Sequence, residues 1–258
     1  MFTGERLTTF DENFSPDLAQ HIAMYHYVLP QVAGKTVLDA GCGEGYGTSL
    51  LASCTGKIIG VDNSREAVRK ASLSYHKSNL EFRHEDIYSL DFQDGQFDCI
   101  CSFQVFEHIR NTEKYLSEIY RVLKDGGCLF LSTPNRLTAF SENPYHLREY
   151  TPYELEDILN GFFPEVSIKG MFGNEKVQRY QELRKSNVNK ILRLDPFKIR
   201  RFIPSAMKKW IFGSLAVLVR KRVRLEGEVF FDAITPADFE VTEHAVEKAL
   251  DIVAICKK

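Results

Sequence analysis

A glycine-rich segment and an acidic residue after it have the types and spacing of a nucleoside-binding site. The segment Val37–Gly47 leads from a short apolar run into glycines at alternating positions, beginning with Gly41. Such glycines permit a tight turn and let a ligand approach backbone N–H groups. Asp62 lies 21 residues after Gly41, where a carboxylate can accept hydrogen bonds from ribose hydroxyls. A tight strand-to-helix turn and a helix cap are the alternative interpretations of these two features.

The spacing of the glycines argues against a dinucleotide fingerprint. The pattern GxGxxG requires a glycine at position 46 or 48, but Tyr46 and Thr48 stand there. Asp39, two residues before the first glycine, would lie unfavourably beside a pyrophosphate. It suits a ligand that carries an ammonium group and a sulfonium cation.

Alternating strands and helices have to position these residues. Short apolar runs, typical of strands buried on both faces of a parallel sheet, recur between helical patterns. They span residues 35–40, 57–62, 80–83, 97–102 and 127–132, and two later runs span 165–170 and 250–256. The alternation predicts an α/β fold with a Rossmann-like, doubly wound, seven-stranded and mostly parallel sheet.

Local signals predict where several of these elements begin and end. Ser15-Pro16-Asp17 is a helix start, and this helix is expected to end at Leu29, ahead of Pro30. Thr151-Pro152-Tyr153-Glu154 is a capping box that begins a later helix. Asp125-Gly126-Gly127 predicts a turn that ends the preceding helix.

Length and composition fit one large globular domain. The chain has 258 residues, of which 44% are hydrophobic and 26% charged, which excludes wholesale disorder. We expect a single domain over residues 1–258, with an N-terminal helical cap (1–33), a cofactor-binding core (34–135) and a basic helical insertion (175–228). The near-neutral net charge of −2 hides an uneven distribution, because residues 176–224 carry 15 Lys or Arg against two acids (15 − 2 = +13).

Cysteine spacing and hydropathy indicate a cytoplasmic protein. The six cysteines show no paired CxxC spacing, so a disulfide framework or a zinc ribbon is not expected. The N-terminus has no apolar run of a signal peptide. The longest apolar run, Trp210–Val219, is too short to span a bilayer as a helix. The sequence leaves the oligomeric state open.

The sequence resembles the class I S-adenosylmethionine-dependent methyltransferases over roughly residues 34–135. Five motifs of that family occur in its order and spacing, namely Leu38–Gly45, Gly60–Ser64, Glu85–Ile87, Phe97–Ser102 and Leu123–Gly127. The resemblance implies S-adenosyl-L-methionine as the cofactor and a last strand that runs antiparallel.

The resemblance also implies which residues contact this cofactor. Asp62 would hold the ribose with Asn63 beside the adenine, Asp86 and Ile87 would contact the adenine, and Gln104 would lie beside the methionine moiety. The complete set of cofactor-binding candidates is Asp39, Gly41, Cys42, Gly43, Gly45, Tyr46, Asp62, Asn63, Asp86, Ile87, Phe103, Gln104, Arg6 and Tyr25.

The flanks resemble a narrower group, the bacterial methyltransferases associated with cell-surface glycan assembly. The matching segments are Thr3–Arg6, His21 with Tyr25, and Asn143–Thr151. This implies that Arg6 and Tyr25 close over the methionine end of the cofactor, and packing of the N-terminal helix is the alternative. Met24 stands where relatives often have an arginine.

Three residues are candidates for a general base. A base is required when a hydroxyl acceptor must lose its proton. Glu107 and His108 resemble a Glu-His pair of several O-methyltransferases, and a structural pair is the alternative. His146 lies in the loop after the fifth predicted strand, where a surface or packing histidine is the alternative. No metal is expected, because Gln104 replaces the acid that metal-binding relatives carry three residues before the Glu.

We therefore expect methyl transfer to an oxygen of a small molecule, a glycan or a lipid-linked acceptor. An NAD-dependent oxidoreductase and a non-catalytic, cofactor-binding membrane adaptor remain alternatives. The basic insertion has lysines and arginines beside an apolar run, at Lys208–Trp210 and Arg220–Arg222. This pattern fits peripheral membrane contact, and a solvated helical lid is the alternative. No nucleic-acid partner is expected, because no known binding module is present.

Overall fold

The computed structural model of the chain describes residues 15–139, 143–192 and 234–258. These residues divide into two compact units. One unit holds the motif-bearing segment, within residues 24–138, 148–172 and 241–258. The other contains the described parts of residues 1–23, 139–147 and 173–240. The prediction of a single domain with a cap and an insertion stays a prediction.

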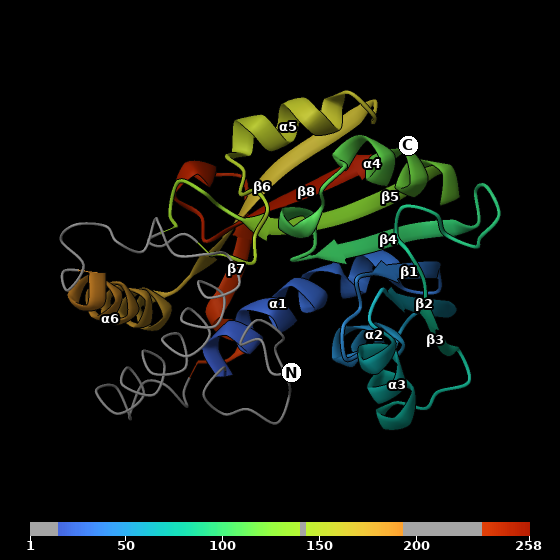
Figure 1. Cartoon of the computed structure of the whole chain (residues 1–258), viewed down its shortest axis with the longest axis horizontal. Coiled ribbons are helices and arrows are strands. Elements are labelled where there is room, and N and C mark those ends of the chain that lie inside the picture. The colour runs from blue at the N-terminus through green and yellow to red at the C-terminus, as the bar shows by residue number, and fades with distance from the viewer. Residues whose placement is uncertain (1–14, 140–142, 193–233) are drawn as a thin grey trace. The chain divides into compact units, whose positions relative to one another are not determined.

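A mixed eight-stranded sheet forms the framework, in the order β3-β2-β1-β4-β5-β8-β6-β7 (Figure 1). Strands β1 to β5 pair in parallel, whereas β8 runs antiparallel to both β5 and β6. The strands are β1 Thr36–Ala40, β2 Lys57–Asp62, β3 Leu80–His84, β4 Phe97–Phe103, β5 Leu123–Pro134, β6 Glu165–Gly173, β7 Phe239–Thr242 and β8 Asp251–Lys257. The predicted α/β class and the mostly parallel sheet are confirmed.

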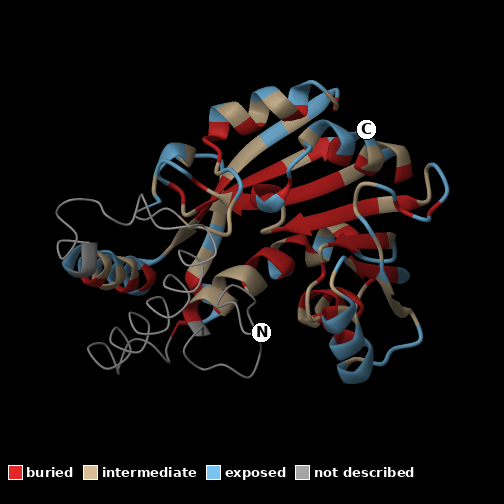
Figure 2. Cartoon of the chain, in the orientation of Figure 1, coloured by how far each residue is buried: buried red, intermediate tan, exposed pale blue. Residues whose placement is uncertain are grey.

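Helices cover both faces of the sheet. The principal core packs alternate strand residues such as Leu38 and Leu131 against α4 (Thr112–Val122) and α5 (Pro152–Asn160). On α4, Tyr115, Leu116 and Ile119 form one apolar stripe, and all three are fully buried. The central strands are buried over most of their length (Figure 2), as expected for parallel strands covered on two sides.

The opposite face of the sheet carries the glycine-rich turn. Helix α2 (Tyr46–Leu51) follows β1 and contacts β2, and helix α3 (Arg65–Ser74) contacts β2 and β3. Ser64 caps α3, because its side chain accepts a hydrogen bond from the backbone of Ala67. Each helix therefore begins directly after the end of a strand, which places both helix N-termini at one edge of the sheet (Figure 1).

Three details differ from the sequence-based expectations. Helix α1 runs from Ser15 to Val32 and includes Pro30, because a proline two residues from the helix end removes only one backbone hydrogen bond. Strand β5 starts at Leu123, so the expected turn lies within it, and Gly126 has a φ of 74° there. The sheet contains an eighth strand, β7, which is four residues long and not fully buried, so it lacks the apolar run that marks the other strands.

Helix α6 (Glu175–Leu192) lies in the first part of the segment for which an insertion is predicted. Within its unit it is tied to the first turn of α1, where Arg184 Nη1 lies 2.8 Å from Asp17 Oδ1. Val177 and Tyr180 lie on one buried stripe of α6. The rest of the insertion, with its clusters at Lys208–Trp210 and Arg220–Arg222, lies outside the described residues. No helix among the described residues is long and apolar enough to cross a membrane.

Candidate active site

The turn after β1 is held open by three glycines in the left-handed region. Gly41, Gly43 and Gly45 have φ values of 88°, 54° and 85°, which side-chain-bearing residues rarely adopt. The backbone N–H groups of Gly41 and Cys42 both donate to the Val61 carbonyl, at 2.8 and 2.9 Å. These bonds join the turn to the end of the neighbouring strand. The motif thus forms the strand-turn-helix arrangement that its sequence predicts.

Asp62 links the glycine turn to the helix that follows β2. Its Oδ2 accepts a hydrogen bond from the Gly43 backbone N–H at 3.0 Å, and its Oδ1 accepts one from Ser64 N–H at 2.8 Å. The side chain is partly exposed. A carboxylate has about four acceptor positions, and these two hydrogen bonds fix Asp62 at the edge where a ribose is expected.

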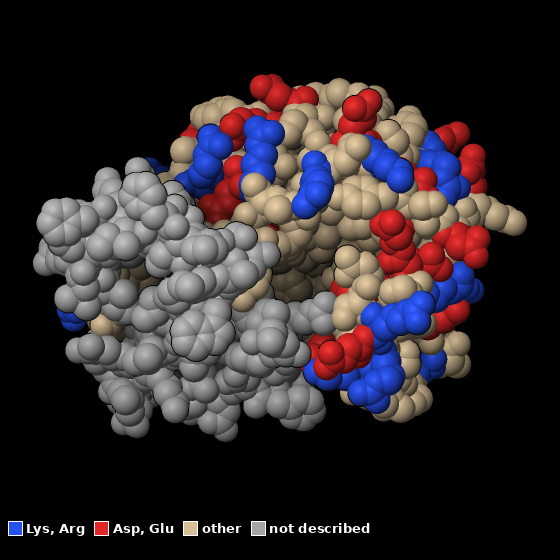
Figure 3. Space-filling model, viewed as in Figure 1, with Lys and Arg blue, Asp and Glu red and all other residues tan. Residues whose placement is uncertain are grey.

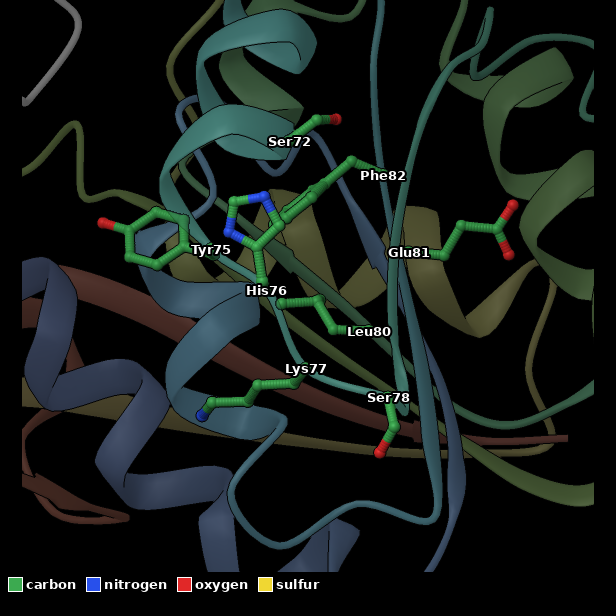
Figure 4. Close-up of a pocket in the computed structure, with 8 residues that line it drawn as sticks. All are labelled: Ser72, Tyr75, His76, Lys77, Ser78, Leu80, Glu81 and Phe82. Atoms are coloured by element: carbon green, nitrogen blue, oxygen red, sulfur yellow. The ribbon is translucent and has the colours of Figure 1, made fainter.

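Close packing behind the turn fixes its position. A Cβ at Gly45 would lie 2.7 Å from the Phe82 ring and from Ala71 Cβ, and a Cβ at Gly60 would lie 2.9 Å from the Phe82 ring. Phe82 also lines a shallow hollow of about 540 Å³ between the end of α3 and the start of β3 (Figure 4). The hollow contains none of the motif residues, so it is distinct from the candidate site.

Asp39 is a buried carboxylate on the face of β1 that meets α1 and α2. It is 1% exposed, and Thr48 Oγ1 donates to its Oδ2 at 2.6 Å. The Tyr25 hydroxyl lies 3.3 Å from Oδ2 and 3.4 Å from Oδ1. Burial raises the pKa of Asp39 to about 7, although the hydrogen bonds from Thr48 and Tyr25 lower it. Within the described part of the chain, no lysine or arginine forms an ion pair with Asp39.

Aromatic side chains surround Asp39. The Tyr25 ring packs edge-on against Phe103, with 4.9 Å between ring centroids, and against Tyr46 at 6.2 Å. Tyr25 and Phe103 are 2% and 3% exposed, so both belong to the wall of the site. Gly47 lies against the Tyr25 ring and leaves no room for a Cβ. An aromatic and anionic environment of this kind favours a cationic group.

The ends of the parallel strands bring the other candidates to the same edge of the sheet. Asn63 follows β2, and Asp86 and Ile87 follow β3. Asn63 and Asp86 are exposed, while Ile87 packs on the principal core. Gln104 follows β4 with a φ of 57°, and its N–H donates to the Ser132 carbonyl at 2.9 Å. A left-handed backbone at a non-glycine residue is strained and is common at functional sites.

Glu107 and His108 lie in a short 3-10 helix (Phe106–His108) after β4. Glu107 is 1% exposed, and its Oε2 accepts a hydrogen bond from Thr133 Oγ1 at 3.0 Å. His108 Nε2 lies 4.0 Å from Glu107 Oε1, and the His108 side chain is 39% exposed. A buried acid therefore lies beside an accessible imidazole, at a separation longer than a hydrogen bond.

Two candidates, His146 and Arg6, are not among the described residues of the motif-bearing unit. His146 belongs to the other unit, where its Nε2 lies 2.8 Å from Asn143 Nδ2. Arg6 lies outside the described residues. The sequence analysis missed Thr48 and Thr133, which hold Asp39 and Glu107 respectively. Thr48 lies seven residues after Gly41, but no motif marks its hydroxyl as a partner of Asp39.

Comparisons with known proteins agree with this geometry. A family model described as a methyltransferase domain matches residues 38–131. A protein of Mycolicibacterium smegmatis named as a probable S-adenosylmethionine-dependent methyltransferase is 36% identical over 180 residues, which cover 66% of this chain and 68% of the relative. A Mycobacterium tuberculosis protein of the same description is 33% identical over 186 residues, with 67% of each chain covered.

The fold has close counterparts among solved structures. A SAM-dependent methyltransferase of Archaeoglobus fulgidus aligns with a TM-score of 0.59 over 96% of this chain and 98% of its own, at 18% identity. The fold and the site thus define a Rossmann-like transferase with a nucleoside-binding edge. The chain belongs to the S-adenosylmethionine-dependent methyltransferases. It is an enzyme whose cofactor is S-adenosyl-L-methionine, and the oxidoreductase alternative loses its support.

The residues present fit this cofactor. The glycine turn provides a surface free of Cβ atoms, and Asp62 provides acceptors beside it. Asp39 supplies a buried negative charge with two hydroxyl partners, which suits an ammonium or sulfonium group. The cofactor, when bound, supplies a methyl group on a positively charged sulfur and is already activated. The chain then has to orient the acceptor and exclude water, which can contribute about 7–11 kcal/mol.

Proposed function

We propose that the chain transfers the methyl group to a hydroxyl oxygen of a small molecule, a glycan or a lipid-linked acceptor. The observation that supports an oxygen acceptor is the pairing of buried Glu107 with the accessible His108. A hydroxyl has to lose its proton during transfer, so its methylation benefits from a positioned base. The flanking segments Thr3–Arg6 and Asn143–Thr151 favour a surface-glycan acceptor within this class.

In the proposed site, Asp62 holds the ribose, and Asn63, Asp86 and Ile87 contact the adenine. Gly41, Cys42, Gly43, Gly45 and Tyr46 form the turn around the methionine moiety together with Asp39, Phe103 and Gln104. Arg6 and Tyr25 close over the methionine end. The positions of the described members at one strand edge support this assignment.

His108 is the proposed general base and Glu107 its positioning residue. The Thr133 hydroxyl donates to the Glu107 carboxylate, so Glu107 is held beside the end of β5. The Glu107 backbone carbonyl also accepts a hydrogen bond from Arg148 N–H at 3.3 Å. His146 is the second candidate base, because Asn143 contacts its ring.

Isotope-labelled cofactor tests the acceptor class directly. The protein is incubated with S-adenosyl-L-methionine that carries a deuterated methyl group and with separate pools of hydroxylated small molecules, glycans and lipid-linked sugars. Mass spectrometry then locates the label. The proposal predicts labelled methyl ethers. Label recovered only on nitrogen or carbon would contradict it.

The same assay tests the base. His108→Gln is expected to lower the turnover rate roughly 100- to 10,000-fold while S-adenosylhomocysteine still binds normally. His244→Gln serves as the matched control, because His244 is exposed in the same unit. A full rate in His108→Gln, with a loss in His146→Gln instead, would assign the base to His146.

A further inference from the structure

Thr48 is the closest hydrogen-bond partner of Asp39. Its hydroxyl lies 2.6 Å from Asp39 Oδ2, whereas the Tyr25 hydroxyl lies 3.3 and 3.4 Å from the two oxygens. Thr48 is fully buried in the first turn of α2, and its backbone carbonyl remains in the helix by accepting from Ala52 N–H. The Thr48 hydroxyl therefore donates to the Asp39 carboxylate, and it also contacts the Cys42 thiol.

The Thr48 methyl group is also fixed. It packs over β2, where a Cβ at Gly60 would lie 3.0 Å from Thr48 Cγ2. The absence of a side chain at Gly60 thus provides the space that Thr48 occupies. Packing holds the methyl group while the hydroxyl points to Asp39, so both branches of the side chain are positioned.

We propose that Thr48 is a positioning residue for cofactor binding, which orients the Asp39 carboxylate toward the cofactor's cationic methionine end. The inference rests on the proposed contact between Asp39 and that end of the cofactor. Thr48 occupies Oδ2 closely, so Oδ1 keeps more acceptor capacity for an ammonium group. The hydroxyl also stabilises the charged form of Asp39, since a hydrogen bond to a carboxylate favours ionisation.

The groups that face Asp39 explain why such a partner matters. Among the residues that the structure describes, these groups include no cation, and they come from α1, the glycine turn, α2, β2 and β4. They are Tyr25, Cys42, Tyr46, Thr48, Asp62 and Cys101. Burial and the Asp62 charge both raise the pKa of Asp39, and Thr48 provides the largest opposing effect.

Near neutral pH, part of the protein molecules carry a protonated Asp39. In these molecules, a cation that binds beside Asp39 has to displace the proton of its carboxyl group. With a pKa of about 7 in the free protein, the ionised fraction of Asp39 falls roughly tenfold between about pH 8 and pH 6. The affinity for S-adenosylhomocysteine, which carries the same ammonium group, is expected to fall by the same factor. Loss of the Thr48 hydroxyl is expected to move the ionisation of Asp39, and the pH dependence of binding with it, about one pH unit higher.

Isothermal titration calorimetry with S-adenosylhomocysteine at about pH 6, 7, 8 and 8.5 tests the inference. Buffers of different ionisation enthalpy report the protons released. Thr48→Val, which keeps the shape of the side chain, is expected to weaken binding about fivefold near pH 7 but less than twofold near pH 8.5. Thr48→Ser is expected to restore the wild-type profile. Thr55→Val removes a buried hydroxyl outside the site and should leave the profile unchanged.

The possible failures are distinguishable. If Asp39→Asn binds as tightly as the wild type at every pH, the proposed contact of Asp39 with the cofactor is wrong. If Asp39→Asn binds weakly but Thr48→Val keeps the wild-type pH profile, the role of Thr48 is wrong. A Thr48→Val defect of equal size at all pH values, or one that Thr48→Ser shares, indicates a merely structural role and also overturns it. Thr48→Ala replaces Thr48→Val if the latter does not fold.

Discussion

At the scale of single residues, the site depends on a buried carboxylate that has no cationic partner among the described residues. Asp39 lies under Tyr25 and beside Thr48, and burial of a charge without a counter-charge is unfavourable. The proposed contact of Asp39 with the cationic end of the cofactor gives this cost a functional reason. The free energy of unfolding is therefore expected to be lower than in a variant that carries an uncharged side chain of the same shape at position 39.

The first prediction concerns Asp39→Asn and the pH dependence of stability. The pKa of Asp39 is raised to about 7 in the folded protein, so the folded state binds this proton more tightly than the unfolded state between about pH 4 and pH 7. The stability that Asp39 contributes is complete below about pH 4 and is lost as the pH rises through 7. Relative to Asp39→Asn, the wild-type free energy of unfolding should fall by about 1.4 kcal/mol per pH unit in this window. Urea denaturation without cofactor measures it, and a difference that does not vary with pH would contradict the prediction.

A second prediction at this scale concerns Gln104. Its φ of 57° destabilises the folded state of a non-glycine residue by about 1–2 kcal/mol. Glycine avoids this cost, but it loses more chain entropy on folding, so only part of the free energy is regained. Gln104→Gly should raise the free energy of unfolding by about 0.5–1 kcal/mol and weaken S-adenosylhomocysteine binding. Denaturation and calorimetry measure the two effects. A variant that is less stable and binds normally would show that the strained backbone has no functional role.

Motif residues could be predicted from the sequence, but their partners could not. Asp62 was found from its distance along the chain, and the glycines from their alternation. Thr48 escaped because its role depends on how α2 turns back against β1, and Thr133 because its partner lies on another strand. Hydrogen bonds between distant side chains leave no periodic signal in a sequence.

At the scale of elements, both backbone conformation and close packing require glycine in the turn after β1. Gly45 has both a positive φ and a neighbouring aromatic ring, whereas Gly126 has a similar φ and nothing within 4 Å of its missing Cβ. The two positions therefore separate the conformational cost of a side chain from its steric cost.

The third prediction uses this pair. Gly126→Ala should lower the free energy of unfolding by about 1–2 kcal/mol, from the left-handed backbone alone. Gly45→Ala adds a clash with Ala71 and Phe82, so it should cost about 1–3 kcal/mol more. Urea denaturation of both variants gives the comparison. Equal losses would show that the turn relaxes freely and does not need close packing against α3.

Element positions were predicted well where strands are fully buried, because continuous apolar runs mark them. The edge strand β7 was missed since it is short and only partly buried. The end of α1 was misplaced because Pro30 is tolerated so close to a helix terminus. Local signals thus fail where tertiary packing can override them.

At the scale of the whole molecule, charge is unevenly distributed along the chain. The described surface in Figure 3 shows acidic and basic side chains interspersed over this face, whereas residues 176–224 carry +13 by the count above. This segment remains the candidate for peripheral membrane contact, and a solvated lid is its alternative.

The fourth prediction tests that contact by flotation of the whole protein with anionic and neutral vesicles. Electrostatic binding predicts flotation with anionic vesicles at low salt and its loss at high salt. Replacement of Lys208 and Lys209 by Gln should weaken it, and replacement of the described exposed Lys77 should not. Absence of flotation at low salt would leave the lid as the interpretation of the segment.

The central claim is that the glycine turn and Asp62 together hold the adenosyl group of the cofactor. Calorimetric titration of S-adenosylhomocysteine into the wild type, Asp62→Ala and Asp98→Ala tests it most directly. Asp98 is the matched acid, because it binds Thr36 N–H and Lys124 instead. We predict that Asp62→Ala weakens binding roughly 10- to 150-fold, from the loss of a hydrogen bond to a charged group, and that Asp98→Ala changes it less than about twofold. Equal effects of the two substitutions, or a wild type that binds NAD and not S-adenosylhomocysteine, would contradict the claim.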